Sequence, residues 1–154
     1  MELKLENVLI RKVITIDSEA TVREASEEMG RLSTSCLVVL SKRRVVGILT
    51  TQDVVNRVAA RGLDPGEVKV GEVMSSPVIM MRPETPLGEA IKVMLQRKIK
   101  KLPIVSGGKS RARLVGMVSL SDLVEFHSWV FSDTWENVLM TVPAVLEEGE
   151  FVVA

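Results

Sequence analysis

The sequence is poor in the residues that build metal, redox and covalent-catalytic sites. Its 154 residues include one cysteine, Cys36, and one histidine, His127. A single cysteine cannot form an internal disulfide, and the pair cannot supply the usual Cys/His ligand set of a zinc site. No nucleophile has an identifiable base, and the histidine has no clear orienting partner. We therefore expect a protein that is not an enzyme.

An excess of one charge and long apolar runs are also missing. Twenty lysines and arginines balance twenty aspartates and glutamates, so no net field attracts a polyanion and nucleic-acid binding is disfavoured. No apolar run approaches the ~20 residues that cross a bilayer, and the charged stretch "MELKLENVLI" has no signal-peptide core. We expect a cytoplasmic protein without a membrane partner.

What the sequence does contain is an internal repeat. Residues 13–25, "VITIDSEATVREA", lie over residues 78–90, "VIMMRPETPLGEA", at an offset of 65. Further on, "GILTTQD" at 47–53 returns as "GMVSLSD" at 116–122, at an offset of 69. Two repeats are too few for a solenoid. A pair of repeats related by a pseudo-twofold axis is the simpler expectation.

Each repeat has the pattern of an α/β unit. In the first repeat, a short strand at 13–16 precedes a helix that the capping box Thr21–Glu24 opens. Two apolar runs around the turn "SKRR" predict a hairpin, and a second helix follows from about Thr51 to Ala60. The predicted order is β-α-β-β-α in both repeats. We assign residues 1–70 to the first repeat with its linker, 71–128 to the second, and 129–154 to a C-terminal extension. That extension is expected to form a short helix and a tail that pack on the module or on a partner.

The doubled heptad has two interpretations. Thr50 with Asp53, and Ser119 with Asp122, have the spacing of a capping box, which is a purely structural role. The same pair can bind a nucleotide, because the carboxylate accepts hydrogen bonds from both ribose hydroxyls and a helix start attracts phosphate. The sequence leaves both interpretations open.

With these motifs the sequence resembles a tandem cystathionine β-synthase (CBS) domain pair, or Bateman module. The resemblance rests on both heptads, on both strand-plus-helix stretches and on "KKLPIV" at 100–105, and it covers about residues 8–127. It implies an α+β fold with two repeats packed sheet to sheet. It also implies two clefts that bind an adenosine compound, either AMP, ADP, ATP or S-adenosylmethionine. A homodimer is the expected assembly, and an effector protein is a further expected partner.

The resemblance also implies which residues line the clefts. The motif aspartate would hold the ribose, the hydroxyls at the helix start would reach phosphate, and the partner repeat would face the base. The first cleft would combine Asp122, Ser119 and Ser121 with Leu9, Ile14, Thr34 and Ser35. The second would combine Asp53 and Thr50 with Met74, Ile79, Ile99 and Lys100. Lys101 is a candidate phosphate contact, because nucleotide-binding members of the family often carry His and Arg at positions 100 and 101.

The leading hypothesis is a regulatory module that binds an adenosine nucleotide and transmits its occupancy through repeat orientation or dimer contacts. The first alternative is a constitutive assembly module whose clefts stay empty, in which the capping interpretation is correct. The second is a sensor of S-adenosylmethionine. Nucleic-acid binding rests only on the basic cluster at residues 97–101.

Overall fold

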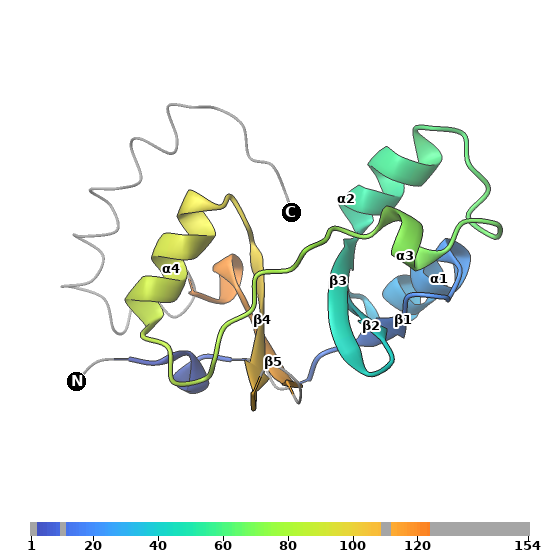
Figure 1. Ribbon diagram of the computed structural model, residues 1–154. Coiled ribbons are helices and arrows are strands. Elements are labelled where there is room, and N and C mark those ends of the chain that lie inside the picture. The colour runs from blue at the N-terminus through green and yellow to red at the C-terminus, as the bar shows by residue number, and fades with distance from the viewer. Residues whose placement is uncertain (1–2, 10–11, 109–111, 124–154) are drawn as a thin grey trace, which may run out of the picture. The chain divides into compact units, whose positions relative to one another are not determined.

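The computed structural model describes residues 3–9, 12–108 and 112–123, which fold into two compact units (Figure 1). One unit is residues 13–78, which we call the first-repeat unit. The other joins residues before 13 to those from Ile79 onward, and its described part is called the second-repeat unit. The predicted extension at 129–154 lies outside the described residues.

The first-repeat unit follows the predicted β-α-β-β-α order. Its elements are β1 (Thr15–Asp17), α1 (Val22–Leu32), β2 (Cys36–Ser41), β3 (Arg44–Thr50), α2 (Thr51–Val54), a π-helical turn η2 (Val55–Ala59) and α3 (Val70–Val73). β1 pairs in parallel with β2, and β2 pairs antiparallel with β3, so the sheet order is β1-β2-β3. The mixed α/β class expected from the sequence is confirmed.

The buried face of α1 and one face of the sheet form the core of this unit. α1 begins at the predicted capping box, since the Thr21 hydroxyl accepts the Glu24 N–H at 3.2 Å and the Glu24 carboxylate accepts the Thr21 N–H at 2.8 Å. Its buried residues recur at helical spacing and pack on alternate residues of β2 and β3. The cluster is Val22, Ala25, Met29, Leu37, Val39, Leu49, Val58, Val70 and Val73.

The second-repeat unit has the same plan with a shorter first strand. It contains η1 (Leu5–Asn7), α4 (Leu87–Gln96), β4 (Lys101–Ser106) and β5 (Arg113–Ser119), and a helix starts at Leu120. β4 and β5 form an antiparallel pair. Where β1 stands in the first repeat there is a single parallel bridge, Met81 with Ile104.

A proline explains the shortened strand. In the first repeat the Val38 N–H donates to the Ile14 carbonyl at 3.0 Å. At the offset of 65, the position of Val38 is taken by Pro103, which has no N–H to donate. The second repeat therefore lacks the backbone hydrogen bond that Val38 makes in the first. The predicted strand keeps its place and register, but it is shorter.

Each repeat packs against a short segment that directly precedes the other repeat in the sequence. Residues 3–9 precede the first repeat, yet they pack on the second: the Leu87 N–H donates to the Leu3 carbonyl at 2.8 Å and the Leu5 N–H to the Thr85 carbonyl at 3.0 Å. Leu5 is fully buried in that unit's core, which also contains Leu87, Ala90, Ile91, Met94, Ile99, Leu102, Ile104, Val118 and Leu123.

Residues 68–74 do the same for the first repeat. The Val22 N–H donates to the Val68 carbonyl at 2.9 Å, and the Val70 N–H donates to the Ala20 carbonyl at 2.8 Å. The two segments, "LKLENV" at 3–8 and "VKVGEV" at 68–73, are again related by the offset of 65. We call them the leading segments. In both units they satisfy the first N–H of a helix, which has no partner inside the helix itself.

Gly47 lies against Met74 and Ser75, which directly follow the leading segment 68–73, and this contact gives a first testable prediction. A Cβ at this position would lie 2.3 Å from the Met74 sulfur and 3.1 Å from the Ser75 carbonyl oxygen. The sulfur can move, but that carbonyl accepts the Ile48 N–H at 3.0 Å. We expect Gly47→Ala to lower the free energy of unfolding by about 1–3 kcal/mol in urea denaturation.

Gly30 in α1 is the matched control for Gly47→Ala, because a Cβ there meets nothing within 4 Å. Alanine is also the better helix former, so Gly30→Ala should leave stability unchanged or raise it by up to about 1 kcal/mol. Equal effects of the two substitutions would contradict the tight contact at Gly47.

Candidate functional site

The motif of the first repeat forms a complete capping box at the start of α2. Thr50 ends β3, and its hydroxyl accepts the Asp53 N–H at 3.2 Å. The Asp53 Oδ2 accepts the Thr50 N–H in return, at 3.0 Å. Both residues are buried, with 7% of Thr50 and 5% of Asp53 exposed. The structural interpretation of the motif is therefore realised here.

The second carboxylate oxygen of Asp53 is also occupied. Its Oδ1 accepts the Ser75 hydroxyl at 3.1 Å and lies 3.7 Å from the Arg57 guanidinium. The same Arg57 nitrogen donates to the carbonyls of Val73 at 2.8 Å and Met74 at 2.9 Å. Asp53 thus stands between the start of α2 and the chain that leaves the first repeat. We call Asp53, Arg57 and Ser75 the linker clasp.

The motif of the second repeat has different surroundings. The Ser119 hydroxyl bonds the Asp122 Oδ2, and that hydroxyl also accepts the Asp122 N–H at 3.1 Å. Oδ2 additionally accepts the Ser119 N–H at 3.2 Å. The hydroxyls of Ser119 and Ser121 lie 3.0 Å apart, Ser121 is exposed, and Asp122 is partly exposed. Within 3–9, 12–108 and 112–123, no hydrogen bond reaches Asp122 Oδ1.

The remaining predicted site residues divide between the two units. Thr34 and Ser35 lie between α1 and β2, near the start of α2, because the Thr51 N–H donates to the Ser35 carbonyl at 3.0 Å. Ile14 precedes β1 in the same unit. The pairing of these three residues with Asp122 joins residues of two units and stays a prediction.

An equivalent contact brings the predicted lysines to the start of the second helix of the other repeat. The Leu120 N–H donates to the Lys100 carbonyl at 2.9 Å, and Lys101 begins β4. Ile79 packs partly buried against the core of the same unit. Asp122, Lys100 and Lys101 therefore belong to one unit, whereas the resemblance groups Lys100 and Ile79 with Asp53.

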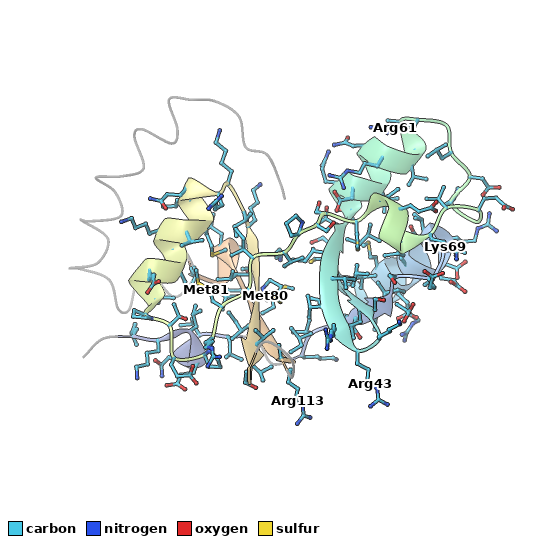
Figure 2. All side chains as sticks on the ribbon, viewed as in Figure 1. Arg43, Arg61, Lys69, Met80, Met81 and Arg113 are labelled. Carbon is cyan, nitrogen blue, oxygen red and sulfur yellow. The ribbon has the colours of Figure 1, made fainter. Side chains whose placement is uncertain are left out.

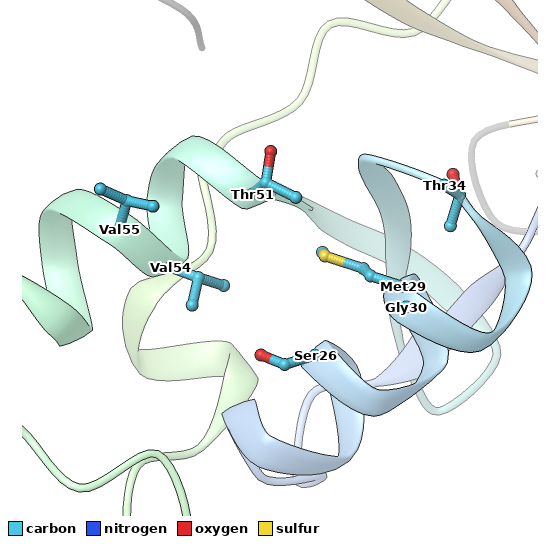
Figure 3. A pocket seen from close by; sticks show the side chains of 7 residues that line it. All are labelled: Ser26, Met29, Gly30, Thr34, Thr51, Val54 and Val55. Atoms are coloured by element: carbon cyan, nitrogen blue, oxygen red, sulfur yellow. The ribbon is translucent and has the colours of Figure 1, made fainter.

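The helical face of the first-repeat unit carries an apolar pocket that the sequence did not indicate. The pocket has a volume of about 340 Å³ and lies between α1 and α2 (Figure 3). Its lining residues are Ser26, Met29, Gly30, Thr34, Thr51, Val54 and Val55. Val55 is 53% exposed. A pocket of this composition suits apolar side chains better than a phosphate.

Exposed charges mark other parts of the surface. Arg43 extends from the tip of the β2–β3 hairpin, and Arg113 is the first residue of β5 (Figure 2). Lys69, in the leading segment 68–73, pairs with Glu19, and this carboxylate raises the pKa of the Lys69 ammonium group. These charges are solvated, as expected for charged side chains at turns.

Neither a metal site nor a membrane-spanning element is found in the part of the chain that the structure describes. Its residues contain no group of three or more His, Cys, Asp or Glu side chains that could hold a metal ion. None of its helices has the length and apolar character needed to span a bilayer.

Comparison with known proteins matches most of the chain to one family. The model of the family described as "CBS domain" matches residues 5–60 and 70–128. The CBS domain-containing protein YhcV of Bacillus subtilis is 32% identical over 119 residues, which are 77% of this chain and 81% of that protein. The uncharacterized protein MK0525 of Methanopyrus kandleri is 30% identical over 83% of this chain, and the match spans 64% of that protein's length.

A solved structure has the same fold. It is the CBS domain pair of protein MJ0100, in complex with 5′-methylthioadenosine and S-adenosyl-L-methionine. The likeness has a TM-score of 0.72, covers 83% of this chain and 98% of that chain, and comes with 21% sequence identity.

Proposed function

This chain belongs to the CBS domain family and carries two of its repeats, and on that premise we propose that it is a regulatory module that senses an adenosine nucleotide. CBS pairs are commonly ligand-binding regulatory modules. The finer proposal is that AMP, ADP or ATP binds at a hydroxyl-x-x-aspartate motif. Occupancy would then be transmitted through the orientation of the repeats or through dimer contacts.

One observation carries the proposal most directly: the partly exposed Asp122 carboxylate lies beside the hydroxyls of Ser119 and Ser121. A carboxylate accepts hydrogen bonds from both hydroxyls of a ribose, and serine hydroxyls donate to phosphate oxygens. Lys100 and Lys101 in the same unit could add positive charge near a phosphate. Protein MJ0100, which shares the fold, holds two adenosine compounds.

The other residues named by the resemblance remain part of the proposal. Ile14, Thr34, Ser35 and Ile79 would face the base, and Thr50 with Asp53 is the alternative motif, in the first repeat, at which a ligand could bind instead of Ser119 with Asp122. We propose no catalytic step and no catalytic cofactor. Homodimerisation through the helices would give the module a contact that ligand binding can change, and the apolar pocket between α1 and α2 supports this assembly.

Calorimetric titration of the purified protein with AMP, ADP, ATP and S-adenosylmethionine tests the proposal. We expect saturable heat with at least one nucleotide. We also expect a thermal shift, because a ligand at 100 times its Kd stabilises the native state by about 2.7 kcal/mol. Folded protein that gives neither heat nor a shift with any nucleotide would favour the constitutive assembly module. Binding of S-adenosylmethionine alone would favour the second alternative.

A further inference from the structure

The two motif aspartates have the same spacing and different partners. We propose that Ser75 and Arg57 occupy the Asp53 carboxylate and hold it to the segment that leaves the first repeat. The chain would then bind one adenosine ligand, through Asp122. This inference rests on the proposed function, because it specifies which of the two motifs serves as the ligand site.

The first step concerns what a ligand would have to displace at Asp53. One carboxylate oxygen is used by the Thr50 N–H, and the other by the Ser75 hydroxyl and by Arg57. With 6% of its side chain exposed, Asp53 has little surface left for two ribose hydroxyls. A ligand would have to remove the Ser75 hydroxyl, leaving a partly buried donor without an acceptor.

The second step concerns how firmly Ser75 is held. Its N–H donates to the Ile48 carbonyl at 2.8 Å and its carbonyl accepts the Ile48 N–H at 3.0 Å. Arg57 holds the two preceding carbonyls, those of Val73 and Met74. Ser75 therefore approaches Asp53 on a backbone that four hydrogen bonds keep in place. Displacing its hydroxyl would strain this whole connection.

The third step is that the sequence places neither a serine nor an arginine at the positions that match Ser75 and Arg57 in the second repeat. At the offset of 65 the position of Ser75 corresponds to Ile10, and at the offset of 69 the position of Arg57 corresponds to Phe126. An isoleucine or phenylalanine side chain can neither donate a hydrogen bond to a carboxylate nor neutralise it. The positions that match Ser75 and Arg57 therefore carry neither a hydrogen-bond donor nor a positive charge that could occupy the Asp122 carboxylate.

The fourth step concerns the atoms that remain available at Asp122. Its Oδ2 accepts both bonds from Ser119, while among the described residues Oδ1 accepts none. A carboxylate oxygen that accepts no hydrogen bond from the described residues, next to an exposed serine hydroxyl, is suited to a vicinal diol, the feature that distinguishes a ribose from a deoxyribose. The preferred ligand is thus a ribonucleoside compound with both hydroxyls free.

The experiment compares Asp122→Asn with the matched variant Asp53→Asn in calorimetric titrations. The probes are AMP, ATP and their 2′-deoxy forms. The wild-type protein should bind one equivalent per chain, and 2′-deoxygenation should weaken that binding by about tenfold or more. Asp122→Asn should cause a similar loss and make the protein insensitive to 2′-deoxygenation. Asp53→Asn should keep one equivalent and its sensitivity to the 2′-hydroxyl, with a lower melting temperature.

The possible outcomes separate this inference from the proposed function. Two equivalents per chain, or loss of binding in Asp53→Asn with retention in Asp122→Asn, would overturn the inference and leave the nucleotide sensor standing. No binding of any probe to the wild-type protein would overturn both. The wild-type stoichiometry needs no variant, so it decides between one and two sites even if a substituted chain fails to fold.

Discussion

Replacing Leu5 with alanine is expected to lower the free energy of unfolding by about 2–5 kcal/mol, the usual cost of a large-to-small change in a packed core. Leu5 is fully buried among residues of the second repeat, although it precedes the first repeat in the chain. The truncated side chain would leave a cavity that the surrounding residues fill only in part. Urea denaturation followed by circular dichroism measures the change.

Glu6 and Val70 provide the controls for Leu5→Ala. Glu6 is an exposed neighbour in the same leading segment, so Glu6→Ala should change stability by less than about 0.5 kcal/mol. Val70 occupies the position of Leu5 in the other leading segment and is equally buried. Val70→Ala should therefore destabilise the first-repeat unit. Leu5→Ala with the effect of Glu6→Ala would contradict the packing of residues 3–9 on the second repeat.

Asp53→Ala is expected to cost about 2–4 kcal/mol of stability, since one buried and one partly buried donor would lose their acceptor at once. The Thr50 N–H and the Ser75 hydroxyl would both be left without their partner, and Arg57 would lose the neighbouring charge. Part of the ion pair's contribution is screened, because the Arg57 side chain is 40% exposed. Chemical denaturation of the ligand-free protein gives the value.

The capping box of α1 offers a comparison with the same geometry and a different environment. Glu24 accepts the Thr21 N–H as Asp53 accepts the Thr50 N–H, but its bonds are exposed to solvent. Glu24→Ala should therefore cost only about 0.5–1 kcal/mol. The excess for Asp53→Ala measures what burial, Ser75 and Arg57 add. Equal losses in the two variants would show that the linker clasp contributes nothing.

Much of the fold was predictable because the repeat is visible in local patterns. The capping boxes at Thr21 and Thr50, the hairpin runs and the order of elements depend on residues close together in the sequence. The shortened first strand of the second repeat could also have been predicted from the sequence. Pro103 stands at a position where the first repeat uses a backbone N–H, but this use becomes clear only once the ladder of the first repeat is known.

The packing of the leading segments and the linker clasp could not be predicted in the same way. Leu5 reaches its partners across about eighty residues of chain, and no local pattern indicates with which repeat a short apolar segment packs. Ser75 lies 22 residues from Asp53, in a stretch that reads as an ordinary polar turn. The motif spacing is that of a capping box, and it is also compatible with a ligand site. Only the positions of Ser75 and Arg57 distinguish the two aspartates.

The exchange of leading segments has a consequence for how the chain folds during synthesis. The first-repeat unit is a continuous stretch, residues 13–78, so all its parts are available once that stretch has left the ribosome. Residues 3–9 are synthesised earlier but must wait for their partners, which extend to Leu123. At roughly 5–20 residues per second the delay lasts about 6 to 23 seconds. Of the two units, the one that contains residues 3–9 is therefore expected to complete its core second.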